Sequence, residues 1–211
     1  MFTNREEAGD LLALKLLDYE GKDCIVLAIP RGGVVVARRV AERLKVPLDL
    51  IIPRKIGAPQ NPEFALGAVT LDGTVVMNPS VNPLGISPDY IQREVKRQKE
   101  EIKRRMKEYR GDKPLPSVSA KIVILIDDGI ATGSTVLAAI ATLEKQRAKK
   151  IILAVPVAPP DTVKRLRRRV DQLICLETPE PFYAVGQFYQ DFTQTTDEEV
   201  IEILKQAQQE M

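Results

Sequence analysis

The stretch from Lys121 to Thr135, which reads KIVILIDDGIATGST, constrains the fold of this chain more than any other. It opens with the apolar run Ile122 to Ile126, which has no polar alternation and is too short for a helix with these flanks. Such a run predicts a central strand that is buried on both faces, and strands of this kind belong to parallel α/β sheets. Ligands of such sheets bind beyond the carboxyl ends of the strands, and Asp127 and Asp128 stand at that end.

A loop of glycine and hydroxyl residues follows the two aspartates and leads into a helix-competent segment, Val136 to Ile140. A loop of this composition at the start of a helix presents free backbone N–H groups to an anion, so it predicts a phosphate site. Carboxylates beside a phosphate site suit a sugar phosphate, whose hydroxyl groups donate to the aspartates. The alternative is a solvated strand end followed by an ordinary turn, which leaves the whole block to coincidence.

Other kinds of site are excluded by spacing or composition. A Walker A loop needs four residues between its glycines and then a lysine, whereas Gly129 and Gly133 are separated by three residues and Ser134 follows. The dinucleotide fingerprint G-x-G-x-x-G does not occur. The chain has no histidine, which excludes Ser-His-Asp and Cys-His mechanisms and argues against a zinc site. We expect Cys24 and Cys175 to be buried, reduced thiols.

The block resembles the phosphoribosyl-pyrophosphate motif of the type I phosphoribosyltransferases, with an apolar strand, an acidic pair, two residues and then A-T-G-S-T. The resemblance implies that Asp127 and Asp128 hold the ribose hydroxyls, with magnesium bound near them largely through substrate and water. It also implies that the loop fixes the 5′-phosphate, through Ala131, Thr132, Gly133, Ser134 and Thr135.

Two earlier strand ends carry cations. Cys24 to Ile29 is expected to be a strand that ends in Pro30-Arg31-Gly32-Gly33 before a helix, and two glycines there allow the backbone to approach an anion. A turn chosen only for tightness is the alternative. The resemblance makes this segment the pyrophosphate loop, with Arg31, Gly32 and Gly33 as the matching positions.

The next predicted strand, Leu48 to Ile52, runs into Arg54 and Lys55, which could also form a solvated rim. In the family an R-K-x-G at this place begins a mobile loop that closes over the pyrophosphate. Lys55 is therefore our candidate for neutralising the leaving group, with Arg54 second. Glu63, the one acid near this loop, could serve the base site or cap a strand.

Two later segments are unusual in composition. Residues 88–110 predict a long, very charged helix with one apolar stripe, and we favour a surface helix over an RNA-binding face. Residues 177–195 are rich in aromatic side chains, which fill a small satellite core or stack on a planar ring. The resemblance implies a base-binding hood here, with stacking by Phe182 or Tyr183.

We therefore predict one α/β domain over residues 1–211, with a mainly parallel sheet of about five strands, helices on both faces and a small hood. The implied activity is transfer of a phosphoribosyl group from phosphoribosyl pyrophosphate to a nitrogen of a nucleobase-like acceptor, with Mg²⁺. Adenine enzymes have alanine at the position of Ala131, and the 6-oxopurine enzymes place a lysine in the segment that corresponds to Pro156–Pro160, where this chain has none. Both features weaken a 6-oxopurine acceptor.

The remaining expectations concern partners. No apolar run is long enough to cross a bilayer and no signal peptide is present, so we expect a cytoplasmic protein without a membrane partner. The net charge of +2 does not argue for nucleic acid, and family habit implies a homodimer. The alternative function is a nucleotide sensor or regulator of this fold that binds RNA or a protein. Its support is the basic residues of the charged helix, from Arg93 to Arg110, and the cluster Lys164, Arg165, Arg167, Arg168 and Arg169.

Overall fold

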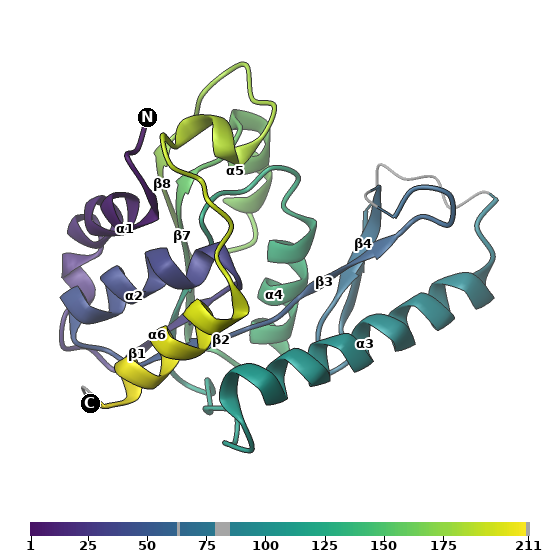
Figure 1. Cartoon of the computed structure of the whole chain (residues 1–211), viewed down its shortest axis with the longest axis horizontal. Coiled ribbons are helices and arrows are strands. Elements are labelled where there is room, and N and C mark those ends of the chain that lie inside the picture. Colours follow the sequence, from purple (N-terminus) through teal and green to yellow (C-terminus); the bar gives the residue numbers. More distant parts are fainter. Residues whose placement is uncertain (63, 79–84, 210–211) are drawn as a thin grey trace.

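The computed structural model describes residues 1–62, 64–78 and 85–209, so Glu63 lies outside the described residues. Figure 1 shows a main body and an arm that extends from it, with the long helix α3 running below the arm. In chain order the elements are α1 (Arg5–Leu14), η1 (Leu17–Tyr19), β1 (Cys24–Ala28), α2 (Gly32–Leu44), β2 (Leu48–Leu50), β3 (Arg54–Gly57), β4 (Ala65–Val69), β5 (Val75–Met77), α3 (Pro88–Arg110), β6 (Ile122–Ile126), α4 (Ser134–Lys145), β7 (Lys150–Val157), α5 (Pro160–Leu166), β8 (Gln172–Glu177), η2 (Val185–Phe188) and α6 (Asp197–Gln209).

The main body is built on one parallel sheet. Its five strands lie in the order β2-β1-β6-β7-β8, and every neighbouring pair is parallel. All residues of β1 are buried, as are four of the five in β6, because helices cover both sides of the sheet. The predicted fold class, a mainly parallel α/β sheet of about five strands, is confirmed.

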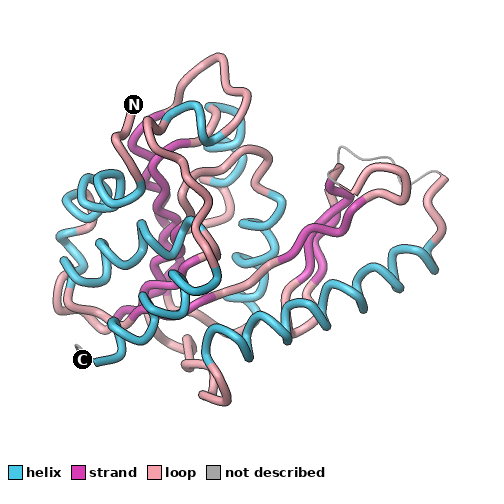
Figure 2. Tube along the Cα trace, in the orientation of Figure 1, coloured by secondary structure: helices cyan, strands magenta, loops and turns pink. Residues whose placement is uncertain are grey.

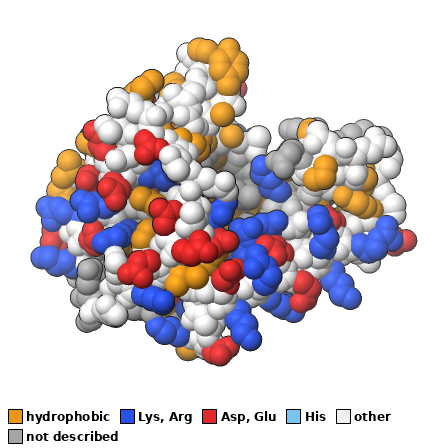
Figure 3. All heavy atoms as spheres, viewed as in Figure 1, with side chains coloured by type: hydrophobic (Ala, Val, Ile, Leu, Met, Phe, Trp, Pro, Cys, Tyr) orange, Lys and Arg blue, Asp and Glu red, His pale blue; other side chains and the backbone are white. Residues whose placement is uncertain are grey.

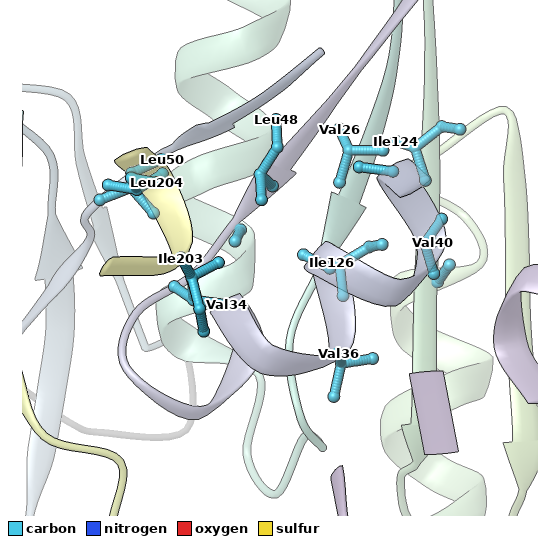
Figure 4. Close-up of a cluster of buried hydrophobic side chains, with 14 of the residues drawn as sticks. Val26, Val34, Val36, Val40, Leu48, Leu50, Ile124, Ile126, Ile203 and Leu204 are labelled. Atoms are coloured by element: carbon cyan, nitrogen blue, oxygen red, sulfur yellow. The ribbon is translucent and has the colours of Figure 1, made fainter. Parts of the chain in front are cut away.

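Alternate residues of each strand serve two separate cores. Val26, Ile124 and Ile126 point to the face covered by α1, α2 and α6, where they join one buried cluster with Val40 and Leu204 (Figure 4). On the opposite face the intervening strand residues pack against α4 and α5; Leu27, Leu125, Ile140 and Leu166 belong to this second cluster. This alternation follows from the two-residue period of a strand.

The arm is a second sheet, which the sequence predicted only in part. Three antiparallel strands lie in the order β3-β4-β5, beside α3 (Figure 2). The segment Arg54–Gly57, which we expected to open a loop, is strand β3. Asp72-Gly73 between two apolar runs is a hairpin signal in the sequence. This turn joins β4 to β5, and the N–H of Thr70 donates to the carbonyl of Thr74 across it.

The aromatic segment 177–195 folds against the N-terminus of the chain. The backbones of Phe2 and Tyr189 form an isolated parallel β-bridge, and the centroids of their rings lie 5.3 Å apart. Tyr189 also lies 5.1 Å from the ring of Phe192, and Phe182 lies 5.0 Å from that of Phe188. Most of these rings therefore fill a small core of their own, one of the two roles expected of them.

Among the helices of the described residues, none is long and apolar enough to cross a membrane.

Candidate active site

The two glycine-containing loops singled out in the sequence meet at the carboxyl end of the sheet. β1 and β6 are neighbours, and Ala28 pairs in register with Ile126. The loop after β1 and the loop after β6 therefore start side by side, although almost a hundred residues separate them in the chain. Parallel pairing is the physical reason, because it places equivalent ends of adjacent strands at one edge.

The first loop, Arg31 to Gly33, lies directly against the acidic pair. A Cβ atom added to Gly32 would lie 1.9 Å from Oδ2 of Asp128, and one added to Gly33 would lie 2.9 Å from Cα of Asp127. Only glycine fits at such distances. The N–H groups of Arg31, Gly32 and Gly33 donate to no protein acceptor among the described residues, and they open helix α2. These N–H groups are available to an anion.

The second loop has the same character at the start of α4. Gly133 has φ of +74° and precedes the first residue of the helix, Ser134. Within the described part of the chain, the N–H groups of residues 132–136 have no acceptor. The loop is held from its other side by α5, because Oγ1 of Thr162 donates to the carbonyl of Ala131 at 2.8 Å and Arg165 donates to that of Thr132.

A cavity of about 320 Å³ opens beside this second loop. Ala131, Thr132 and Ser134 line it on one side, Val76 and Met77 of β5 on another, and Arg165 contributes a guanidinium. A concave space with free N–H groups and a cation at its wall suits a phosphate group.

The acidic pair itself is largely enclosed. Burial, and then the charge of Asp128, raise the pKa of Asp127 well above the ordinary carboxyl value. Oδ1 of Asp127 accepts from the backbone N–H of Asp128 at 2.9 Å. Nε of Arg5 donates to Oδ2 of Asp128 at 2.7 Å. The two adjacent carboxyl groups therefore differ: Asp127 has a raised pKa, and Asp128 is paired with Arg5.

Arg5 is a site residue that sequence reasoning missed. It is the first residue of α1, and its partner Asp128 is 123 positions away. A local pattern carries no signal for such a contact. The one available hint is that a basic residue in the first turn of a helix opposes the helix dipole, so it needs a compensating partner.

The two cations expected near the pyrophosphate lie on different faces of β3. Arg54 is half-buried against α3, where its Nε donates to Oε1 of Gln98 at 2.7 Å, and burial lowers its pKa. Lys55 is exposed, and within the described residues it forms no hydrogen bond or ion pair with any other predicted site residue. Arg54 therefore binds α3, whereas the side chain of Lys55 is exposed to solvent.

Arg31 has a carboxylate nearby from the last helix. Its Nη1 lies 3.8 Å from Oδ1 of Asp197, the first residue of α6. The hydroxyl of Tyr109 on α3 donates to the same oxygen. Burial, and then Asp197, raise the pKa of Tyr109 to about 12. Asp197 therefore links the first loop to both α3 and α6.

The two predicted base-stacking residues differ in exposure. Phe182 is partly buried against Phe188 in the aromatic core, whereas Tyr183 is 83% exposed. Both lie in the segment that also carries Tyr189, whose hydroxyl donates to the carbonyl of Asp128 at 2.6 Å. The aromatic segment is thus fastened to the acidic pair.

Comparison with known proteins agrees with this arrangement. A family model described as "Phosphoribosyl transferase domain" matches residues 3–193. Two strains of Mycobacterium tuberculosis, CDC 1551 and H37Rv, each have a protein named "Putative phosphoribosyl transferase" that is 41% identical over 209 residues. This match covers 98% of the chain but 47% of each relative, so the chain spans about half the length of these relatives.

Solved structures give the same result for the fold. The crystal structure of TT1426 from Thermus thermophilus is 41% identical, with a TM-score of 0.82 over 97% of this chain and 98% of that one. The AQ2163 protein from Aquifex aeolicus, at 13% identity and a TM-score of 0.54 over 95% of this chain and 83% of that one, shares the fold alone. With the family model over most of its length and these relatives, the chain belongs to the phosphoribosyl transferase domain family.

Proposed function

We propose that the chain binds phosphoribosyl pyrophosphate and transfers its phosphoribosyl group to a nitrogen of a nucleobase-like ring, with release of pyrophosphate. The observation that carries this proposal is the meeting of two loops with free N–H groups at adjacent strand ends, with Asp127 and Asp128 between them. A ligand with an anionic group at each end and hydroxyl groups in the middle matches this order of donors and acceptors.

The charges assign a role to each part. Loss of pyrophosphate leaves positive character on the anomeric carbon, so the site must favour a cationic sugar and a strongly negative leaving group together. The N–H groups of residues 31–33, with Arg31 and Lys55, would take the negative charge, and Asp127 and Asp128 would hold the ribose hydroxyls. The second loop would fix the 5′-phosphate, so that the anomeric carbon meets the incoming nitrogen in line.

The acidic pair fits Mg²⁺ in one particular manner. No group of three metal-binding side chains occurs in the described part of the chain, so the protein by itself offers no closed cage. Mg²⁺ commonly uses one or two carboxylates and completes its shell with phosphate oxygens and water. Asp127 and Asp128 would supply that share, with magnesium neutralising the departing pyrophosphate when bound.

The proposal for the acceptor ring starts from the hood, the aromatic segment 177–195. Because Phe182 already packs against the ring of Phe188, the exposed Tyr183 is the better candidate to stack on the acceptor ring. Ala131 and the absence of lysine from residues 156–160 favour a ring without a 6-oxo group.

The sensor or regulator remains the second candidate function, but the charged helix supports it less than its sequence suggested. Glutamates of α3 neutralise many of its cations: ion pairs join Arg97 to Glu94, Lys103 to Glu100, and Arg104 and Arg105 to Glu101. Figure 3 shows basic and acidic side chains interleaved over this helix. Such a surface attracts a polyanion weakly.

The test is pyrophosphate release from phosphoribosyl pyrophosphate and Mg²⁺ against purines, pyrimidines and pyridine carboxylates. The double variant Asp127→Asn/Asp128→Asn serves as the inactive form, and Asp112→Asn, an exposed position after α3, serves as the matched control. We expect release that requires one class of acceptor, is lost in the double variant and is kept in the control.

Binding of phosphoribosyl pyrophosphate without turnover on any acceptor would refute the transferase and favour the sensor. In that case steeply salt-dependent RNA binding would identify the partner. The homodimer and the cytoplasmic location stay predictions, which sedimentation and cell fractionation test.

A further inference from the structure

Arg5, the first residue of α1, belongs to neither loop but contacts Asp128 of the acidic pair. The residue is 9% exposed. Its side chain is 10% exposed and that of Asp128 is 15% exposed, and Nε lies 2.7 Å from Oδ2. Largely desolvated pairs of this kind have strong directional hydrogen bonds, so the position of Arg5 fixes the position of the Asp128 carboxylate.

The guanidinium is itself fixed by the aromatic segment. Nη1 donates to the carbonyl of Thr193 at 2.8 Å, and Cζ lies 3.9 Å from the centroid of the Phe192 ring. The planar group therefore has a hydrogen bond at each side and an aromatic ring on one face. A lysine has no planar fork that could reproduce this geometry.

Asp128 is held at its backbone as well as at its side chain. The Tyr189 hydroxyl donates to its carbonyl, and Tyr189 packs on Phe2, three residues before Arg5. The N-terminal segment, through Arg5, and the aromatic segment, through Tyr189, thus both hydrogen-bond to Asp128. Oδ2 is engaged, whereas Oδ1 of Asp128 accepts no hydrogen bond from the described residues.

We propose that Arg5 is a positioning residue for the phosphoribosyl group: it holds Asp128 by Oδ2, which leaves Oδ1 for a ribose hydroxyl. The inference rests on the proposed function, because it assigns the ribose to the acidic pair. Within the described residues Arg5 donates hydrogen bonds to Asp128 and Thr193 and to neither phosphate loop, although its Nε lies beside Gly32, where an added Cβ would be 2.7 Å away. Its directional contacts therefore act on the sugar site.

The experiment compares two ligands by calorimetry with Mg²⁺ and without acceptor. Phosphoribosyl pyrophosphate has the ribose, and inorganic pyrophosphate lacks it. We expect Arg5→Gln to weaken binding of the first by about 10- to 100-fold, the range for a hydrogen bond to a charged group. Pyrophosphate affinity should change by less than about threefold, since the loop that would hold it donates from the backbone.

Two further variants separate positioning from structure. Arg5→Lys retains the charge and should recover only part of the affinity. Phe192→Leu leaves Arg5 in place without its ring and should give a smaller loss with the same preference for the sugar ligand, which keeps the inference testable if Arg5→Gln does not fold. Arg39→Gln is the matched control, because Arg39 binds Asp10 at 2.7 Å and 3.2 Å in an exposed position.

The outcomes are distinct. Equal losses for both ligands, or unchanged sugar-ligand affinity in a folded Arg5→Gln, would overturn the role of Arg5 and leave the proposed function standing. A wild-type protein that binds pyrophosphate but not phosphoribosyl pyrophosphate would refute the proposed function, and this inference with it.

Discussion

Arg110 and Asp49 form a bidentate ion pair that fastens the last residue of α3 to the edge strand β2. Nε and Nη2 each lie 2.7 Å from a carboxylate oxygen, and the two residues are 9% and 8% exposed. Arg110 also donates to the carbonyls of Lys113 and Pro114, so hydrogen bonds hold all three nitrogens of its guanidinium. The pair joins the C-terminal end of α3 to the parallel sheet of the main body.

Removal of one partner should therefore be strongly destabilising. We expect Arg110→Met to lower the free energy of unfolding by about 3–5 kcal/mol, because the buried charge of Asp49 loses its cationic partner and keeps only the N–H of Leu50. Urea unfolding measures the change. The control is Arg104→Ala on the same helix, whose pairs with Glu101 and Glu108 lie at the surface and should contribute little to stability. A loss in Arg110→Met no larger than in the control would contradict the prediction.

The sequence predicts the parallel sheet well because its signal is local. Runs such as Ile122–Ile126 are apolar throughout, and each is followed by a loop whose residues differ sharply from the strand. The cap of the last helix is local too. The pattern Thr196-x-x-Glu199 predicts a reciprocal cap, and the side chain of each residue accepts from the backbone N–H of the other, at 3.1 Å for Thr196 Oγ1 and 2.6 Å for Glu199 Oε2.

Contacts between distant parts of the chain are harder to predict. Strand β3 is four residues long with two charges, so it carries no strand pattern, and only its pairing with β4 and its packing on α3 make it one. Arg5 is similar, because nothing near it in sequence resembles a site. For the first helix, the capping-box pattern Thr3-x-x-Glu6 predicts a cap at Thr3. The cap is one position later, at Asn4, whose Oδ1 accepts from the N–H of Glu7.

Gly32 should be intolerant of any side chain. In Gly32→Ala the new Cβ would lie 1.9 Å from Oδ2 of Asp128 and 2.7 Å from Nε of Arg5, so that ion pair must move. We expect a loss of about 1–3 kcal/mol in stability, the usual range for overpacking, together with loss of phosphoribosyl pyrophosphate binding. Calorimetry and thermal unfolding measure the two effects.

The control for Gly32 is Gly21→Ala. Gly21 has no atom within 4 Å of an added Cβ, but its φ is +68°. It should lose about 1–2 kcal/mol from the backbone alone, with ligand binding unchanged. Similar binding in both variants would show that the close approach at Gly32 is not needed.

Asp197 should weaken anion binding at the first loop. It lies 3.8 Å from Arg31 and so competes with any anion for that guanidinium. We expect Asp197→Asn to tighten pyrophosphate binding by about two- to fivefold at low salt, a gain typical of a partly exposed ion pair that salt removes. Glu198→Gln, which alters the same helix turn without a contact to Arg31, is the control. An affinity gain that persists unchanged in high salt would argue against this electrostatic origin.

The two aspartates of the acidic pair should respond oppositely to the same substitution. Burial raises the pKa of Asp127, so the unfolded chain ionises first as the pH rises. The contribution of this group to stability therefore falls from pH about 4, the ordinary carboxyl range, up to the raised native pKa. Asp127→Asn removes that loss and keeps an oxygen for the N–H of Asp128. At pH 7 it should be more stable than wild type by about 0.5–2 kcal/mol, and the gain should vanish below pH about 4.

Asp128→Asn instead leaves the 10%-exposed Arg5 without its anionic partner, and should lower stability at pH 7 by about 1.5–3 kcal/mol, the range for a hydrogen bond to a charged group. Thermal unfolding of both variants from pH 3.5 to 8 measures the two effects. Both variants lose a carboxylate proposed to hold the ribose, so both should lose turnover although their stabilities move apart. Stability shifts of the same sign would show that burial of Asp127 and the pairing of Asp128 with Arg5 do not set the energetics of the pair.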